Sequence, residues 1–171
     1  MRSTAKITLG VLALLAANVV QARAQTCNTN PCSLNDTAKV TVTTVLRLTL
    51  SAAATPLTPP TEAAYDAGFM LDNGPVVGVK SNRAWTVKIS ANAALWTAAN
   101  GANASKAAGN LQWATTVAGP YTGLSTSPVN FITGSGTGNT SQTAYYKTLW
   151  SYSSDTPGDY SLVVVYTLSA P

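Results

Sequence analysis

The sequence has 171 residues, of which 9% are charged and none is histidine. The lack of histidine excludes catalytic Ser-His-Asp and Cys-His arrangements. The formal net charge is +4, but Lys and Arg form no cluster beyond the N-terminal leader, which excludes the basic surface of a nucleic-acid-binding protein.

Residues 1–24 have the three-part pattern of a secretory signal peptide. Arg2 and Lys6 precede an apolar run at residues 7–20, and Ala22 and Ala24 provide the small side chains of a cleavage site. The run of roughly 14 residues is short for a membrane span of about 20, so cleavage after Ala24 is predicted rather than a retained anchor. The protein is therefore expected to be exported to the periplasm, the cell surface or the extracellular space. After cleavage, seven basic and six acidic residues remain and no stable membrane span is expected.

The two cysteines of the chain, Cys27 and Cys32, lie in an N-terminal segment at residues 25–37. In an oxidising compartment this spacing predicts a local disulfide. The alternative is a metal pair, but zinc requires four ligands and the sequence has no His and no further Cys. No metal site is expected.

A β domain is predicted at residues 38–171. It opens with residues 39–50, where apolar side chains alternate with Thr and Arg, the pattern of a long, half-buried strand. Three prolines between residues 56 and 60 then require a loop, and residues 62–66 allow one short helical turn.

Turn residues divide the middle of the chain into short strands. Asp72-Asn73-Gly74 predicts a turn between two strands at residues 69–71 and 75–79. The next strand is expected to place Trp85, Val87 and Ile89 inward and Lys88 outward. After it, the composition predicts a mobile loop at residues 98–109, strands at residues 111–117 and 129–133, a turn around Tyr121, and a flexible connector at residues 134–139.

Two strands close the chain, at residues 143–152 and 160–168, joined by a turn at residues 155–158. Both parities are apolar at residues 162–166, which predicts a central last strand covered on both faces. About eight or nine short strands indicate an all-β fold, a two-sheet immunoglobulin-like sandwich, with a closed barrel as the alternative.

Three segments carry a family resemblance: the opening strand at residues 39–50, the Val-Lys-Ser-Asn-Arg-Ala-Trp-Thr-Val stretch at residues 79–87, and the Pro-Gly-Asp-Tyr hairpin with its following strand at residues 156–168. This pattern resembles the immunoglobulin-like domains of WxL-type surface proteins and the group of spore-coat-U proteins and archaic pilins. The resemblance implies a protein that forms or decorates extracellular surfaces and fibres.

Catalytic chemistry has few candidates in this sequence. A pair of carboxylates for hydrolysis, or a calcium site with Asp155 and Asp159, would draw on the acids of the β domain, which are Glu62, Asp66, Asp72, Asp155 and Asp159. Asp72 and Asp155 head predicted turns, where Asp is favoured for its hydrogen bonds to the backbone. We therefore expect a protein that is not an enzyme and has no cofactor.

Aromatic side chains suggest carbohydrate binding on an exposed Trp or Tyr platform, which is the alternative functional prediction. Trp85, Trp113 and Trp150 are expected in the core. Trp96, beside an Ala-Asn-Gly loop, and Tyr121 are the residues predicted to contact such a ligand.

Unpaired sheet edges suggest assembly with other chains, which is the main functional prediction. The opening strand is expected to pair within its own domain, with pairing to a neighbouring copy as the alternative. The sequence thus predicts a secreted structural or adhesive surface protein, with a fibre or pilus-type subunit as one form of it. The expected partners are further copies of itself, other surface proteins or glycans.

Overall fold

The computed structural model describes residues 25–171, so the predicted signal peptide lies outside the described residues. These residues divide into two units, with the boundary between Thr41 and Val42. Residues 25–41 contain no helix or strand, and a disulfide joins Cys27 to Cys32, as the sequence predicts, with their Cα atoms 5.8 Å apart. The β domain is the second unit.

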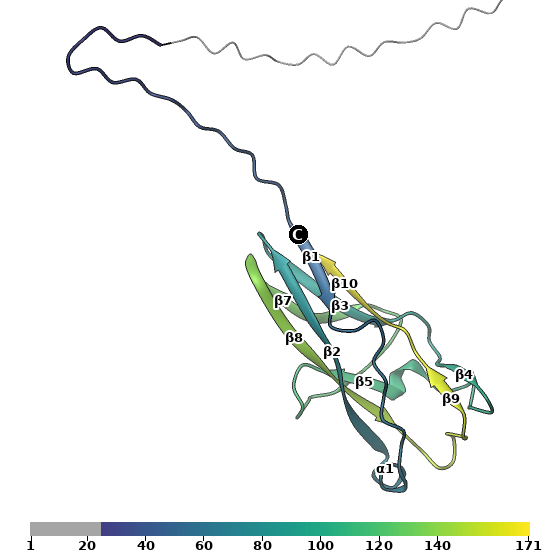
Figure 1. Ribbon diagram of the computed structural model, residues 1–171. Coiled ribbons are helices and arrows are strands. Elements are labelled where there is room, and N and C mark those ends of the chain that lie inside the picture. The colour runs from purple at the N-terminus through teal and green to yellow at the C-terminus, as the bar shows by residue number, and fades with distance from the viewer. Residues whose placement is uncertain (1–24) are drawn as a thin grey trace, which may run out of the picture. The chain divides into compact units, whose positions relative to one another are not determined.

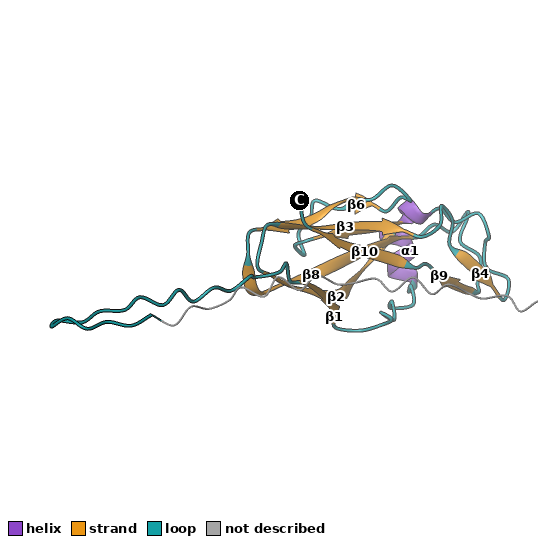
Figure 2. Cartoon of the chain, turned by 90° about the horizontal axis from the view of Figure 1, so that it is seen from above, coloured by secondary structure: helices purple, strands orange, loops and turns teal. Residues whose placement is uncertain are grey.

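The domain is an all-β sandwich, as predicted (Figure 1). A five-stranded sheet has the order β1-β2-β8-β5-β6, and a three-stranded sheet has the order β10-β3-β7. Figure 2 shows β3 and β10 in one layer and β1, β2 and β8 in the other. The first sheet comprises β1 (Leu46–Leu50), β2 (Phe69–Ser81), β5 (Leu111–Ala114), β6 (Thr122–Gly123) and β8 (Thr137–Leu149). The second comprises β3 (Trp85–Ala91), β7 (Val129–Gly134) and β10 (Val164–Ser169).

Alternating side chains from both sheets form the core, since successive residues of a strand point to opposite faces. Val87 and Ile89 of β3 are fully buried, as are Val77 and Val79 of β2 and Leu111 of β5. The sequence prediction for β3 is confirmed, because Trp85 is also buried and Lys88 is exposed.

The opening strand is shorter than the alternation predicts. Only Leu46–Leu50 forms a strand, and it pairs with β2 from Leu46 opposite Ser81 to Leu50 opposite Val77. Because β2 ends at Ser81, residues 39–45 have no strand to extend the ladder. Pairing within the domain is thus confirmed for Leu46–Leu50 alone.

The predicted turn at Asp72-Asn73-Gly74 is wrong, since β2 runs unbroken from Phe69 to Ser81. Its pairing with β8 shifts between Asn73 and Val76, so Gly74 and Pro75 form a bulge. A bulge tolerates a proline because the ladder needs no N–H donor there.

The last strand is at an edge, which corrects the prediction of a central strand. β10 pairs with β3 on one side, and the sheet order ends at β10. The connector predicted at residues 134–139 is shorter than expected, because β7 ends at Gly134 and β8, in the other sheet, begins at Thr137.

Smaller elements complete the domain. β4 (Thr97–Ala99) and β9 (Asp159–Ser161) form a two-stranded sheet, and a 3-10 helix spans Ala108–Asn110. The predicted helical turn is α1 (Glu62–Ala67), which begins where the Thr61 side chain accepts a hydrogen bond from the Ala64 N–H. Across residues 25–171, the structure has no helix with the length and apolar character of a membrane span.

Candidate assembly groove

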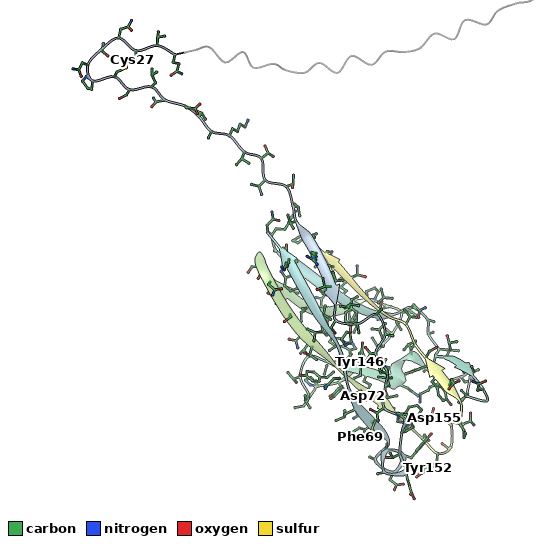
Figure 3. The ribbon with its side chains drawn as sticks, in the orientation of Figure 1. Cys27, Phe69, Asp72, Tyr146, Tyr152 and Asp155 are labelled. Carbon is green, nitrogen blue, oxygen red and sulfur yellow. A yellow bond between two sulfur atoms is a disulfide. The ribbon has the colours of Figure 1, made fainter. Side chains whose placement is uncertain are left out.

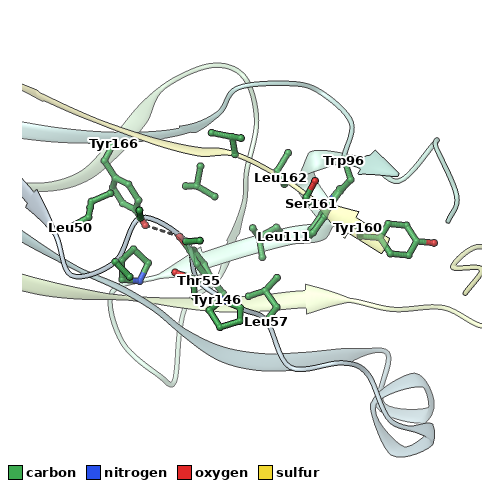
Figure 4. A pocket seen from close by; sticks show the side chains of 17 residues that line it. Leu50, Thr55, Leu57, Trp96, Leu111, Tyr146, Tyr160, Ser161, Leu162 and Tyr166 are labelled. Carbon is green, nitrogen blue, oxygen red and sulfur yellow. Dashed lines mark hydrogen bonds between the residues drawn. The ribbon is translucent and has the colours of Figure 1, made fainter. Parts of the chain in front are cut away.

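A pocket of about 440 Å³ opens into the core between two segments that are far apart in the sequence. One wall is the loop after β1, from Leu50 to Leu57, and the other is the chain from Tyr160 to Tyr166. Figure 4 shows Leu111 of β5 and Tyr146 of β8 between these walls. We call this pocket the assembly groove.

Two tyrosines place a hydrogen-bonded pair of hydroxyl groups in the groove. The hydroxyl groups of Tyr146 and Tyr166 lie 2.9 Å apart and share a hydrogen bond across the two sheets (Figure 4). Burial raises the pKa of both phenols, and the neighbouring Tyr146 raises that of Tyr166 further. Both rings are therefore neutral at physiological pH. The hydroxyl groups of Thr55 and Ser161 also line the groove, and the residues that line it carry no charged side chain.

Trp96 is not the exposed residue that the sequence predicts. Its side chain is only 5% exposed, and its indole N–H donates to the Ala107 carbonyl at 3.1 Å. The Tyr160 ring meets it edge-on at 6.4 Å between centroids. Backbone hydrogen bonds from the Trp96 N–H to the Lys106 carbonyl and from the Ala108 N–H to the Ala94 carbonyl hold this part of the chain against residues 106–108, and Trp96 also lines the groove. It cannot serve as an open stacking platform.

The free edge of β10 borders the groove. Val164, Tyr166 and Leu168 pack against the core, whereas Val163 and Val165 are 59% and 37% exposed. Where β10 begins, both faces of this edge strand are apolar, so unpaired backbone groups and hydrophobic surface are available for another strand. Among the described residues, this edge is not paired with any strand.

The segment before β1 has the complementary pattern. Val40 and Val42 are 84% and 76% exposed, although they continue the parity of Leu48, which packs against the core. Asn82 fixes the last part of this segment, because its side chain donates to the Thr43 carbonyl at 2.8 Å and accepts from the Val45 N–H at 2.9 Å. Val40 and Val42 thus alternate with Lys39, Thr41 and Thr43 in a segment that pairs with no strand of residues 25–171.

The carboxylates considered for catalysis or calcium binding are engaged separately. Asp155 is buried and pairs with Lys106, while Asp159 accepts a hydrogen bond from Asn100. Asp72 lies within β2 instead of a turn and accepts hydrogen bonds from the backbone N–H and hydroxyl of Thr58. Figure 3 places the side chains of Asp72 and Asp155 at separate positions in the domain.

Glu62 and Asp66 lie on α1, where the Asp66 carboxylate accepts from the Tyr152 hydroxyl at 3.2 Å. Within residues 25–171, no three His, Cys, Asp or Glu side chains are grouped so that they could hold a metal ion.

Sequence reasoning missed the residues that define the groove. Tyr146 and Tyr166 lie 20 positions apart on strands of different sheets, and a single sequence has no signal that joins them. The free edge was signalled by the two apolar faces at residues 162–166, but the same pattern fits a central strand. Tyr121, the other predicted ligand contact, lies outside the groove and borders a second cleft.

Comparison of the sequence with models of known protein families finds no match. Comparison with curated proteins also finds none.

Proposed function

We propose that this protein is an exported structural subunit that assembles by inserting residues 39–45 of one copy into the assembly groove of the next. The observation that carries the proposal is the groove itself, which reaches core residues beside the unpaired edge of β10. An added strand would extend the three-stranded sheet by backbone hydrogen bonds and bury its alternate side chains.

The pattern of residues 39–45 suits this role. Val40 and Val42 would face the groove, while Lys39, Thr41 and Thr43 would face solvent, as strand geometry requires. The segment is exposed and extends a strand that already belongs to the sandwich. A second copy is the chosen occupant because one chain carries both the donor segment and the groove.

The remaining support comes from the sequence. The pattern resembles WxL-type surface domains and the spore-coat-U and archaic pilin group, which form or decorate extracellular surfaces and fibres. The Cys27–Cys32 disulfide favours an oxidising compartment and so fits the predicted export. A structural role without catalysis or a cofactor is part of the proposal.

The test measures molar mass against concentration for the chain that begins at residue 25, by sedimentation velocity. The unchanged chain is expected to form oligomers, and Val40→Asp with Val42→Asp is expected to leave monomers, since a charge buried in the groove is costly. Thr41→Asp with Thr43→Asp is the matched control, because it adds the same charges on the opposite parity and should still assemble.

A monomer at every concentration would refute the proposal, as would equal loss of assembly in the two charged variants. The first result would mean that the segment closes on its own domain or remains free.

A further inference from the structure

A second cleft, of about 290 Å³, lies away from the assembly groove on the five-stranded sheet. Tyr145 of β8 belongs to it, between contributions from β2 and from the loop that follows β5. We call it the tyrosine cleft. Its lining residues are Thr58, Leu71, Asp72, Asn73, Val117, Tyr121 and Tyr145.

The loop that carries one wall is fixed by its own hydrogen bonds. The Tyr121 hydroxyl donates to the Val117 carbonyl at 2.8 Å, and the Thr116 hydroxyl donates to the Gly119 carbonyl at 2.7 Å. Gly119 has a φ of 84°, a left-handed conformation that favours glycine. The Gln142 side chain of β8 donates to the Thr115 carbonyl at 2.7 Å and so ties the loop to the sheet. The cleft is therefore formed before any ligand arrives.

The walls combine exposed apolar and aromatic side chains with polar ones. Leu71 and Val117 are 45% and 59% exposed, and they accompany the rings of Tyr121 and Tyr145. Aromatic and aliphatic surfaces of this kind suit the C–H face of a sugar ring. The side chains of Thr58 and Asn73 supply polar groups for hydroxyls at the rim.

Two charged side chains of opposite sign, Asp72 and Lys147, lie at or near the cleft. Oδ1 of Asp72 accepts two hydrogen bonds from Thr58, whereas its Oδ2 is buried and has no hydrogen-bond partner among the described residues. The Lys147 ammonium lies 4.3 Å from the centre of the Phe69 ring and 6.0 Å from that of Tyr121. The opposite charges of Asp72 and Lys147 offset each other beside the cleft, which favours a neutral ligand.

From these observations we infer that the tyrosine cleft binds one neutral pyranose ring of a glycan. The volume is near the lower end of small-molecule pockets, which suits a single ring. The inference goes beyond assembly, because it gives each subunit a ligand site separate from the groove. It also retains Tyr121 from the two predicted carbohydrate contacts and replaces Trp96 with Tyr145.

The experiment titrates the chain with methyl glycosides of glucose, galactose, mannose and N-acetylglucosamine, and with sialic acid as a charged comparison. NMR spectra of tyrosine rings and of leucine and valine methyl groups report where each sugar binds. We expect at least one neutral glycoside to shift the signals of Leu71, Val117, Tyr121 and Tyr145. Probe concentrations of about 10 mM exceed the millimolar dissociation constant expected for one ring.

Variants separate binding at the cleft from binding elsewhere. Tyr121→Ala and Tyr145→Ala are each expected to weaken binding about tenfold, the effect of losing one aromatic contact. Tyr152→Ala is the matched control, since Tyr152 is 65% exposed and is not among the residues that line the cleft. Unchanged signals from core methyl groups establish that each variant is folded.

Three results would overturn the inference: no cleft signal moves with any neutral glycoside, only sialic acid binds, or binding survives the loss of both cleft tyrosines. None of them bears on assembly, which is measured by molar mass alone.

Discussion

The ammonium nitrogen of Lys106 lies 2.6 Å from Oδ1 of Asp155, and the two side chains are 0% and 2% exposed. The ammonium also donates to the Leu149 carbonyl at 2.8 Å and lies 4.1 Å from the centre of the Trp150 ring. Oδ2 of Asp155 accepts from the Ser151 N–H. The pair therefore joins the loop after β4 to the chain after β8 in the interior of the domain.

Breaking this pair is expected to destabilise the domain strongly. Asp155→Asn leaves a buried ammonium without its counter-charge, which costs about 3–5 kcal/mol of unfolding free energy. Adding Lys106→Met to it is expected to restore part of the loss, because the unpaired charge is then removed. Urea unfolding of the single and double variants measures both effects.

The control for this prediction is Asp159→Asn. Asp159 is exposed and bonds to Asn100, so its substitution is expected to change stability by less than about 0.5 kcal/mol. Equal effects at the buried and exposed positions would contradict the structural role assigned to the Lys106–Asp155 pair.

The sequence correctly predicted those features of the fold that depend on the local residue pattern alone. The alternation of Trp85, Val87 and Ile89 located β3 because side-chain parity is a property of the strand itself. The composition of residues 98–109 predicted a mobile loop, yet Lys106 within this segment is one of the most buried residues. The partner of Lys106 is 49 positions away, and no local pattern indicates that contact.

The other errors have the same origin, because neighbouring strands decide them. Residues 39–45 alternate like a strand, but β2 ends at Ser81 and offers no partner. The Asp72-Asn73-Gly74 sequence has turn residues, but pairing with β8 keeps the strand extended. Two apolar faces at residues 162–166 fit a central strand, and in this structure they accompany a free edge. The alternation of residues 39–45 was visible in the sequence, but the groove into which we propose that they insert was not.

Filling the assembly groove is expected to block assembly without unfolding the domain. Ala53 is exposed and lines the groove, so Ala53→Trp can place its ring in the opening. Ala63→Trp, at an exposed position of α1, is the control and should still assemble. Size-exclusion chromatography with light scattering provides the molar mass.

A mixing experiment sharpens this prediction. The Ala53→Trp chain keeps its donor segment, and the chain with Val40→Asp and Val42→Asp keeps its groove. Their mixture should give dimers of one chain of each kind and nothing longer. Long oligomers in the mixture, or none at all, would contradict insertion of one copy into the next.

Alkaline pH is expected to destabilise the domain through Tyr146 and Tyr166. Burial raises both pKa values above the ordinary value of about 10. The folded state therefore retains phenolic protons that the unfolded state has lost, and stability that is fully present below pH 10 falls as the pH rises above it. Unfolding free energies measured by urea from about pH 8 to pH 11 should fall more steeply in the unchanged protein than after Tyr146→Phe with Tyr166→Phe. Parallel pH curves would show that these phenols do not contribute.

The bulge in β2 predicts different effects for two glycines in paired strands. A methyl group at Gly74 would lie 2.7 Å from the Tyr146 ring and 2.9 Å from the Ala144 carbonyl oxygen, whereas one at Gly138 of β8 would meet nothing within 4 Å. Gly74→Ala must displace backbone as well as a buried ring, so we expect a loss of about 1–3 kcal/mol. Gly138→Ala restricts only the unfolded chain and should be neutral or slightly stabilising. Thermal unfolding of the two variants compares them directly, and equal melting temperatures would mean that Gly74 is not needed for the close approach of Tyr146.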